Sequence, residues 1–165
     1  MKSFQTAFVA FIIAASAPAQ SADTTYTLKL MTPETALKAA LASLHTCRKE
    51  GYQVAVAVVD RAGRTQVVLS DRFAGMHTPE TATNKAWTAV SFKLDTSQFA
   101  EVTQSGKEAS GIRHLPRVVA IGGGMVIEAG GSFYGGIGVS GAPGGAADEQ
   151  CAQAGIAAVI EDLEF

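Results

Sequence analysis

The sequence predicts an α+β protein in which one five-stranded antiparallel sheet is covered by helices. Apolar runs of strand length follow one another across short turns within residues 53–70 and again within residues 118–140. Strands joined by such short turns pair antiparallel. The segments before, between and after these two groups repeat apolar residues every three or four positions, as amphipathic helices do. Helices that alternate with groups of antiparallel strands are typical of α+β domains.

Composition and the N-terminal segment indicate the class of protein. The 165 residues are 47% hydrophobic and 17% charged, which suits one domain with its own core. Residues 1–19 are typical of a signal peptide, with Lys2 before an apolar stretch and Ala17-Pro18-Ala19 as a small-x-small cleavage site. We therefore expect residues 20–165 to form a single exported domain, periplasmic or secreted.

Charge and hydropathy argue against two classes of partner. The net charge is −2 and the basic residues are scattered, so the chain has no electrostatic footprint for nucleic acid. The apolar stretch of residues 7–15 is too short to span a bilayer, and no later stretch replaces it. We expect neither a nucleic-acid partner nor a membrane span.

The first half of the domain is predicted to be a helix followed by a hairpin. The helix begins at Pro33, with Thr32 as its N-cap, and ends near Gly51. One face of it is apolar and consists of Leu37, Ala40, Leu41, Leu44 and Cys47. Strands at residues 53–59 and 65–70 follow, joined by a turn at residues 60–64.

A second helix is expected to run to about Lys93, with Thr78 as its N-cap and Pro79 at its first position. One of its faces carries unusually small residues, namely Ala82, Ala86, Ala89 and Val90. A short helix that begins near Thr96 and a polar loop over residues 106–116 lead to the second group of strands.

The last predicted strand has one face almost without side chains. Alternation places Ile137 and Val139 on one face and Gly136, Gly138 and Ser140 on the other. A row of glycine in a strand indicates that something approaches the backbone closely. This is either a helix packed tightly on the sheet, which the small face of the second helix fits, or a flat ligand that contacts Gly136 and Gly138.

A final amphipathic helix is expected from about Ala146 to Ile160. It contains Cys151, and the only other cysteine, Cys47, lies on the buried face of the first helix. Export would place both in an oxidising compartment, where a disulfide persists. We predict a bridge between Cys47 and Cys151, with two buried thiols as the alternative.

Several common motifs are excluded by spacing. The glycine-rich segments lack Gly-Lys-Ser/Thr, and Asp148 and Glu149 in the first turn of the final helix would repel a phosphate. The residues around Ser140 lack the Gly-x-Ser-x-Gly pattern of a serine hydrolase. The histidines, His45, His77 and His114, lack the spacing of a zinc site.

Three residues remain as candidates for chemistry. His77 and His114 lie in loops, where functional residues are often placed, although a histidine in such a loop is more often simply solvated. Lys85 lies on the small-residue helix, where a buried lysine would serve as nucleophile or base. We expect instead that its side chain reaches solvent at the helix edge.

Four segments together resemble the GlcG/HbpS-like family, also called the haem-degrading domain family. They are Val56-Ala57-Val58-Val59-Asp60-Arg61-Ala62-Gly63, Thr83-Asn84-Lys85-Ala86-Trp87-Thr88-Ala89, Gly122-Gly123-Gly124-Met125-Val126-Ile127, and Gly135-Gly136-Ile137-Gly138-Val139-Ser140-Gly141 with Asp148-Glu149 following. The resemblance covers residues 32–158 and implies a profilin-like sandwich, usually assembled into homo-oligomers.

For some members the resemblance also implies binding of haem or a corrinoid. Haem needs an apolar slot and one axial donor, and the candidate donors are His77, with Met76 beside it, and His114. Arg113 or Arg117 would pair with the propionates. The loops that carry the two histidines depart from commoner members of the family.

Three functions stay open at this point. The leading one is binding of haem or another small flat ligand, linked in secreted relatives to haem sensing or degradation. The second is an enzyme acting on a small organic acid, with Lys85, His77 or Arg72 handling protons or the carboxylate. The third is a non-catalytic interaction module whose glycine face only packs a helix.

Overall fold

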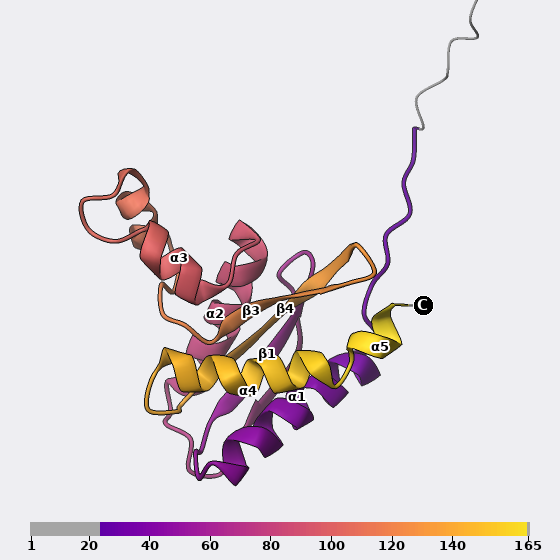
Figure 1. Cartoon of the computed structure of the whole chain (residues 1–165), viewed down its shortest axis with the longest axis horizontal. Coiled ribbons are helices and arrows are strands. Elements are labelled where there is room, and N and C mark those ends of the chain that lie inside the picture. Colours follow the sequence, from indigo (N-terminus) through magenta and orange to yellow (C-terminus); the bar gives the residue numbers. More distant parts are fainter. Residues whose placement is uncertain (1–23, 165) are drawn as a thin grey trace, which may run out of the picture.

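The computed structural model describes residues 24–164 (Figure 1). The predicted signal peptide lies outside these residues. The helices are α1 (Pro33–Lys49), α2 (Thr78–Phe92), α3 (Thr96–Val102), α4 (Gly145–Ala157) and α5 (Ile160–Leu163), with a 3-10 helix η1 (Glu108–His114). The strands are β1 (Ala55–Asp60), β2 (Thr65–Ser70), β3 (Gly124–Ala129) and β4 (Ser132–Ser140). None of the described helices has the length and apolar character needed to cross a membrane.

The strands form one antiparallel sheet in the order β2-β1-β4-β3. Helices α1 and α4 lie side by side on one face of this sheet, and α2 packs on the other face (Figure 1). The predicted α+β fold with an antiparallel sheet covered by helices is therefore confirmed. The sheet has four strands, however, and not the five that the sequence predicts.

The missing strand is the apolar run of residues 118–121. The N–H of Val119 donates to Oγ1 of Thr88 on α2 at 3.0 Å, so this segment bonds to a helix rather than to a neighbouring strand. The chain then turns at Gly122, which packs against the backbone of Gly145. An apolar run of this length does not by itself distinguish a strand from a half-buried connection.

The helix starts follow the predicted capping pattern with one change. Thr32 is the N-cap of α1, and its hydroxyl oxygen accepts the N–H of Thr35 at 3.2 Å. The N-cap of α2 is His77 rather than Thr78, because the carbonyl of His77 accepts the first helical N–H, from Thr81, at 3.0 Å. The Thr78 hydroxyl instead donates backwards to the carbonyl of Gly75 at 2.7 Å.

The face of the sheet beneath α2 consists mainly of small residues. In the β1–β4 register Ala57 lies opposite Gly138. A Cβ at Gly138 would lie 2.0 Å from the carbonyl oxygen of Ala82, and one at Gly136 would lie 3.0 Å from that of Ala86. The packed-helix alternative is thus confirmed. The face of Gly136 and Gly138 is occupied by α2 and is not open to a flat ligand.

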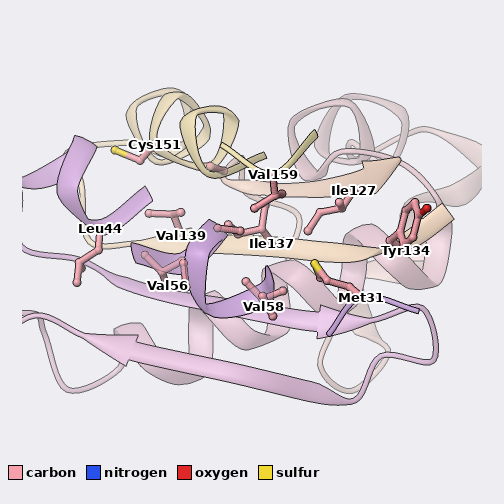
Figure 2. Packing of buried hydrophobic residues seen from close by; sticks show 14 of the residues in the cluster. Met31, Leu44, Val56, Val58, Ile127, Tyr134, Ile137, Val139, Cys151 and Val159 are labelled. Atoms are coloured by element: carbon pink, nitrogen blue, oxygen red, sulfur yellow. The ribbon is translucent and has the colours of Figure 1, made fainter. Parts of the chain in front are cut away.

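The other face of the sheet carries the main hydrophobic core (Figure 2). Ile137 and Val139 of β4 pair with Val58 and Val56 of β1, and all four side chains are fully buried beneath α1 and α4. Each such side chain contributes about 1.5–3 kcal/mol when removed from water. The alternation predicted for β4, apolar on one face and bare on the other, is confirmed.

Cys47 of α1 and Cys151 of α4 form the predicted disulfide, with their Cα atoms 5.5 Å apart. The bridge joins positions 104 residues apart, which in the chain-entropy model stabilises the fold by about 4–5 kcal/mol. It ties the two helices together on the core side of the sheet, away from α2.

We predict that Gly138→Ala lowers the free energy of unfolding by about 1–3 kcal/mol, because its methyl group would overlap the Ala82 carbonyl and push α2 off the sheet. Urea unfolding followed by circular dichroism measures this change. Gly111→Ala is the control, because a Cβ there meets no atom within 4 Å. Equal unfolding curves for Gly138→Ala and wild type would contradict the close packing of α2.

The double variant Cys47→Ala/Cys151→Ala should lose about 2–5 kcal/mol of unfolding free energy, because the unfolded chain regains the freedom that the bridge removes. Chemical unfolding with and without reductant measures it. Reductant should shift the midpoint of the wild type and leave that of the variant unchanged. A wild-type midpoint that does not respond to reductant would be incompatible with the bridge.

Candidate functional site

A cleft of about 690 Å³ opens where β4 ends and where α2 and α4 begin. Thr78, Thr81 and Lys85 of α2 line one wall, and their spacing places them on one face of that helix. The loop from Ser140 to Gly145, between β4 and α4, lines the opposite wall. The cleft is therefore built on the ends of three regular elements.

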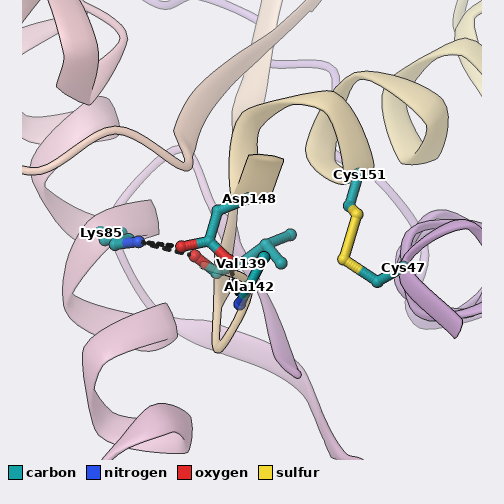
Figure 3. The surroundings of a disulfide bond; sticks show 6 residues. All are labelled: Cys47, Lys85, Val139, Ala142, Asp148 and Cys151. Carbon is teal, nitrogen blue, oxygen red and sulfur yellow. Dashed lines mark hydrogen bonds and ion pairs between the residues drawn. A yellow bond between two sulfur atoms is a disulfide. The ribbon is translucent and has the colours of Figure 1, made fainter. Parts of the chain in front are cut away.

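Lys85 and Asp148 form a buried ion pair in this cleft (Figure 3). Nζ of Lys85 donates to Oδ2 of Asp148 at 2.7 Å and to the carbonyl oxygen of Val139 at 3.0 Å. The two side chains are only 2% and 5% exposed. Oδ1 of Asp148 accepts the N–H of Ala142 at 3.0 Å, so the pair joins α2 to the end of β4 and to the first turns of α4.

The expectation that Lys85 reaches solvent at the helix edge is wrong. Helix α2 lies so close to the sheet that the Lys85 side chain is enclosed between them. Its Nζ lies beside Gly123, and a Cβ added at Gly123 would lie 2.9 Å from it. Burial raises the pKa of the Asp148 carboxyl, and the neighbouring Lys85 acts in the opposite direction. A perturbed carboxyl in a cleft marks a candidate site for binding or proton exchange.

Two exposed apolar side chains, from different segments, line the cleft. Phe73, from the loop after β2, is 78% exposed, and Ile121, from the segment before β3, is 56% exposed. Asp71 anchors the loop, because its carboxylate accepts bonds from the Arg48 guanidinium at 2.6 and 3.0 Å. These bonds lower the pKa of Asp71, so the anchor keeps its charge at neutral pH.

Of the two candidate histidines, His77 lines this cleft and His114 does not. His77 is the exposed N-cap residue of α2, and Met76 beside it is fully exposed. His114 ends η1 and lines a separate hollow of about 330 Å³. The structure thus places the two histidines in different hollows.

The arginines considered for the propionates already have partners. Arg113 donates to the hydroxyl of Thr103 at 2.9 Å and to the carbonyl of Ala100, which ties η1 to α3. The guanidinium of Arg117 lies over the Trp87 ring, 4.7 Å from its centroid. Arg113 therefore holds η1 against α3 in this arrangement.

Within residues 24–164, no three His, Cys, Asp or Glu side chains are grouped so that they could hold a metal ion. The cleft instead combines a buried pair of opposite charges with exposed apolar side chains. Pockets with mostly apolar walls and a few convergent polar groups are typical of sites for small molecules and cofactors.

A model of the family described as "Haem degrading protein HbpS-like" matches residues 31–157. The chain belongs to this HbpS-like family. Two solved structures share most of the fold. A double mutant of HbpS from Streptomyces reticuli is 39% identical with a TM-score of 0.75, and the match covers 88% of this chain and 97% of that one. Protein ORFY from Klebsiella pneumoniae is 25% identical with a TM-score of 0.80, over 84% and 97%.

Similarity extends to PduO proteins. A crystal structure of a PduOC:heme complex is 31% identical with a TM-score of 0.74, over 79% of this HbpS-like chain and 95% of that chain. The corrinoid adenosyltransferase PduO from Salmonella typhimurium is 38% identical over 90 residues, which are 53% of this chain. This chain spans only 27% of the length of that relative.

Asp148 is the site residue that sequence reasoning missed. The sequence indicates only an acidic residue in the first turn of a helix, and its partner Lys85 lies 63 positions away. No local spacing rule connects residues so far apart. The one available signal is that both lie in segments that carry the family resemblance.

We predict strong coupling between Lys85 and Asp148 in a double-mutant cycle. Lys85→Met or Asp148→Asn alone leaves an uncompensated buried group and should cost about 3–5 kcal/mol of unfolding free energy. The double variant Lys85→Met/Asp148→Asn should lose less unfolding free energy than the two single variants added together. The difference, measured by urea unfolding, should exceed about 1 kcal/mol.

The chain contains a matched control for this cycle. Lys38 and Asp162 have the same 2.7 Å separation, but their side chains are 54% and 49% exposed. The cycle of Lys38→Met and Asp162→Asn should give a coupling energy below about 1 kcal/mol. Coupling energies that do not differ between the two pairs would show that burial of Lys85 and Asp148 has no energetic consequence.

Proposed function

We propose that this HbpS-like protein is an exported haem-binding protein and that haem binds in the cleft beside α2. The observation that carries the proposal is the presence, in one cleft of about 690 Å³, of exposed Phe73 and Ile121 together with the imidazole of His77. An apolar slot with one axial donor is the minimal requirement of a haem site.

The apolar residues of the cleft fit a flat macrocycle. Covering Phe73 and Ile121 with an apolar ligand is favourable by about 25 cal/mol for each Å² removed from water. Exposed apolar surface that lines a hollow is more often functional than scattered exposed residues are. When bound, haem would supply an iron centre for oxygen or electron chemistry.

His77 fits the role of axial donor better than His114 does. Its imidazole does not cap α2, so a ring nitrogen remains for iron. The hollow beside His114 is lined by Thr103, Ser105, Ser110, Gly111 and Arg113, which offer no apolar wall. Arg113 is also bound to Thr103 and Ala100, so it is a poor partner for a propionate.

Relatedness and redox chemistry support the wider proposal. The chain resembles PduOC, whose solved structure is a complex with heme. A disulfide between buried cysteines is typical of oxidising compartments, which supports a periplasmic or secreted location. We extend the proposal to haem sensing or degradation by a homo-oligomer, as the family resemblance implies.

A second candidate is an enzyme acting on a small organic acid. The buried charges of Lys85 and Asp148 favour it, because they lie in the same cleft as His77. Lysine, carboxylate and imidazole are groups that exchange protons in acid–base catalysis. Consumption of a small carboxylic acid by haem-free protein, lost in Lys85→Met/Asp148→Asn, would establish this function.

We expect a haemin titration, followed by Soret absorbance, to saturate near one haem per chain with a Kd in the micromolar range or tighter. His77→Ala should alter the Soret band and weaken binding by about tenfold or more, because it removes the proposed iron ligand. His114→Ala is the matched control and should bind as the wild type does. A titration that never saturates would reject haem binding, and unchanged spectra in His77→Ala would reject this axial ligand.

A further inference from the structure

The buried ammonium group of Lys85 retains one hydrogen-bond donor. An ammonium group has three N–H donors. The contacts of Nζ use two of them, at Oδ2 of Asp148 and at the carbonyl oxygen of Val139. Because Lys85 lines the cleft, the third donor is available to an acceptor atom that enters it.

Asp148 does not act as a free anion in this cleft. Both of its carboxylate oxygens have partners, Oδ2 the ammonium of Lys85 and Oδ1 the N–H of Ala142. The charges of Lys85 and Asp148 are adjacent and opposite, so the pair adds no net charge to the cleft. A second anion can therefore approach Lys85 without meeting an uncompensated negative charge.

The other ionisable residues around the cleft do not change this balance. His77 and Tyr52 line it, and neither side chain is negatively charged at neutral pH. Glu149 follows Asp148 in the chain but does not line the cleft, and its carboxylate accepts the hydroxyl of Ser97 at 2.8 Å. The cleft is thus neutral or weakly positive.

The first turn of α4 adds donors to the same cleft. Its N-cap is Gly144, which has no side chain to accept the first N–H groups of the helix. The N–H of Gly145 makes no hydrogen bond to any described residue, and both glycines line the cleft. An uncapped helix N-terminus carries partial positive charge, which favours an anion beside it.

A polar atom in the wall of the cleft also lacks a partner. Oε1 of Gln53 is buried and has no hydrogen-bond partner among residues 24–164, and Gln53 lines the cleft. Buried polar groups in folded proteins nearly always have a partner. A polar ligand in the cleft would give this amide one, either at its oxygen or, after rotation, at its N–H group.

We propose that Lys85, Asp148 and Gly145 form a carboxylate-binding subsite between the two walls of the cleft, where Lys85 Nζ and the Gly145 N–H donate to a carboxylate on a flat apolar ligand. Phe73 and Ile121 contact the apolar body of that ligand. Two kinds of ligand share this chemistry, haem through a propionate and a free aromatic carboxylic acid. The subsite lies in the cleft of the proposed haem site, but it does not require haem to be the ligand.

The first test compares 2-naphthoate with 2-naphthamide by isothermal titration calorimetry on the disulfide-bonded protein. The two probes have the same flat body and differ only in the carboxylate. We expect 2-naphthoate to bind at least about tenfold more tightly, because charge-assisted hydrogen bonds are roughly twice as strong as neutral ones.

Variants tie this preference to Lys85. Lys85→Met/Asp148→Asn removes both charges and avoids an unpaired buried one, and the preference for 2-naphthoate should fall below about threefold in it. Lys38→Met is the control, because Lys38 is exposed and does not line the cleft, and it should keep the full preference. Circular dichroism confirms that each variant is folded before titration.

The second test compares haemin with haemin dimethyl ester, which lacks free propionates. If haemin binds at least about tenfold more tightly than its ester, a propionate is the carboxylate that the subsite takes. If 2-naphthoate is preferred and haemin does not bind, the subsite stands and the haem proposal fails. If haemin and its ester bind equally and 2-naphthoate shows no preference, the subsite is wrong and haem binding stands. Absence of binding by all four probes would overturn both.

Discussion

The close approach of α2 to strands β1 and β4 is the constraint on which the rest of the structure depends. It is possible because the residues in contact are small: Gly136, Gly138 and Ala57 on the sheet, and Ala82 and Ala86 on the helix. Larger residues at these positions would hold the helix away from the sheet. At the usual separation, a lysine on α2 would reach water and not the end of β4. The buried ion pair is thus a consequence of close backbone contact at and around Lys85 itself.

The two faces of the sheet have different roles. Below β4, Ile137 and Val139 pack with α1 and α4 into a conventional core that the disulfide reinforces. On the other face of β4, α2 packs through smaller apolar residues such as Ala82, Ala86 and Val90. The Thr88 hydroxyl on α2 also accepts the N–H of Val119. The cleft lies at the end of the second face, where α2 and α4 begin. The main hydrophobic core therefore lies on one side of the sheet, and the candidate site lies at the end of the other.

Much of the fold follows from local patterns, and the candidate site follows from them only in part. Alternation in β4, the Thr32 cap and the pairing of Cys47 with Cys151 are all readable in the sequence, because period, capping chemistry and cysteine count constrain them directly. The run at residues 118–121 misleads, since apolar character does not reveal that its backbone bonds to Thr88. The Lys85–Asp148 pair could not be predicted from the sequence, because it depends on how closely two elements far apart in the chain approach each other.

The disulfide closes the chain into a covalent ring that contains the whole sheet, α2 and both members of the ion pair. The exposed stretch around η1, between Thr103 and Val118, also lies inside this ring. A protease that cuts once in that stretch leaves one molecule, because the two pieces remain joined through α1 and α4. A single cut at this surface would therefore release neither fragment.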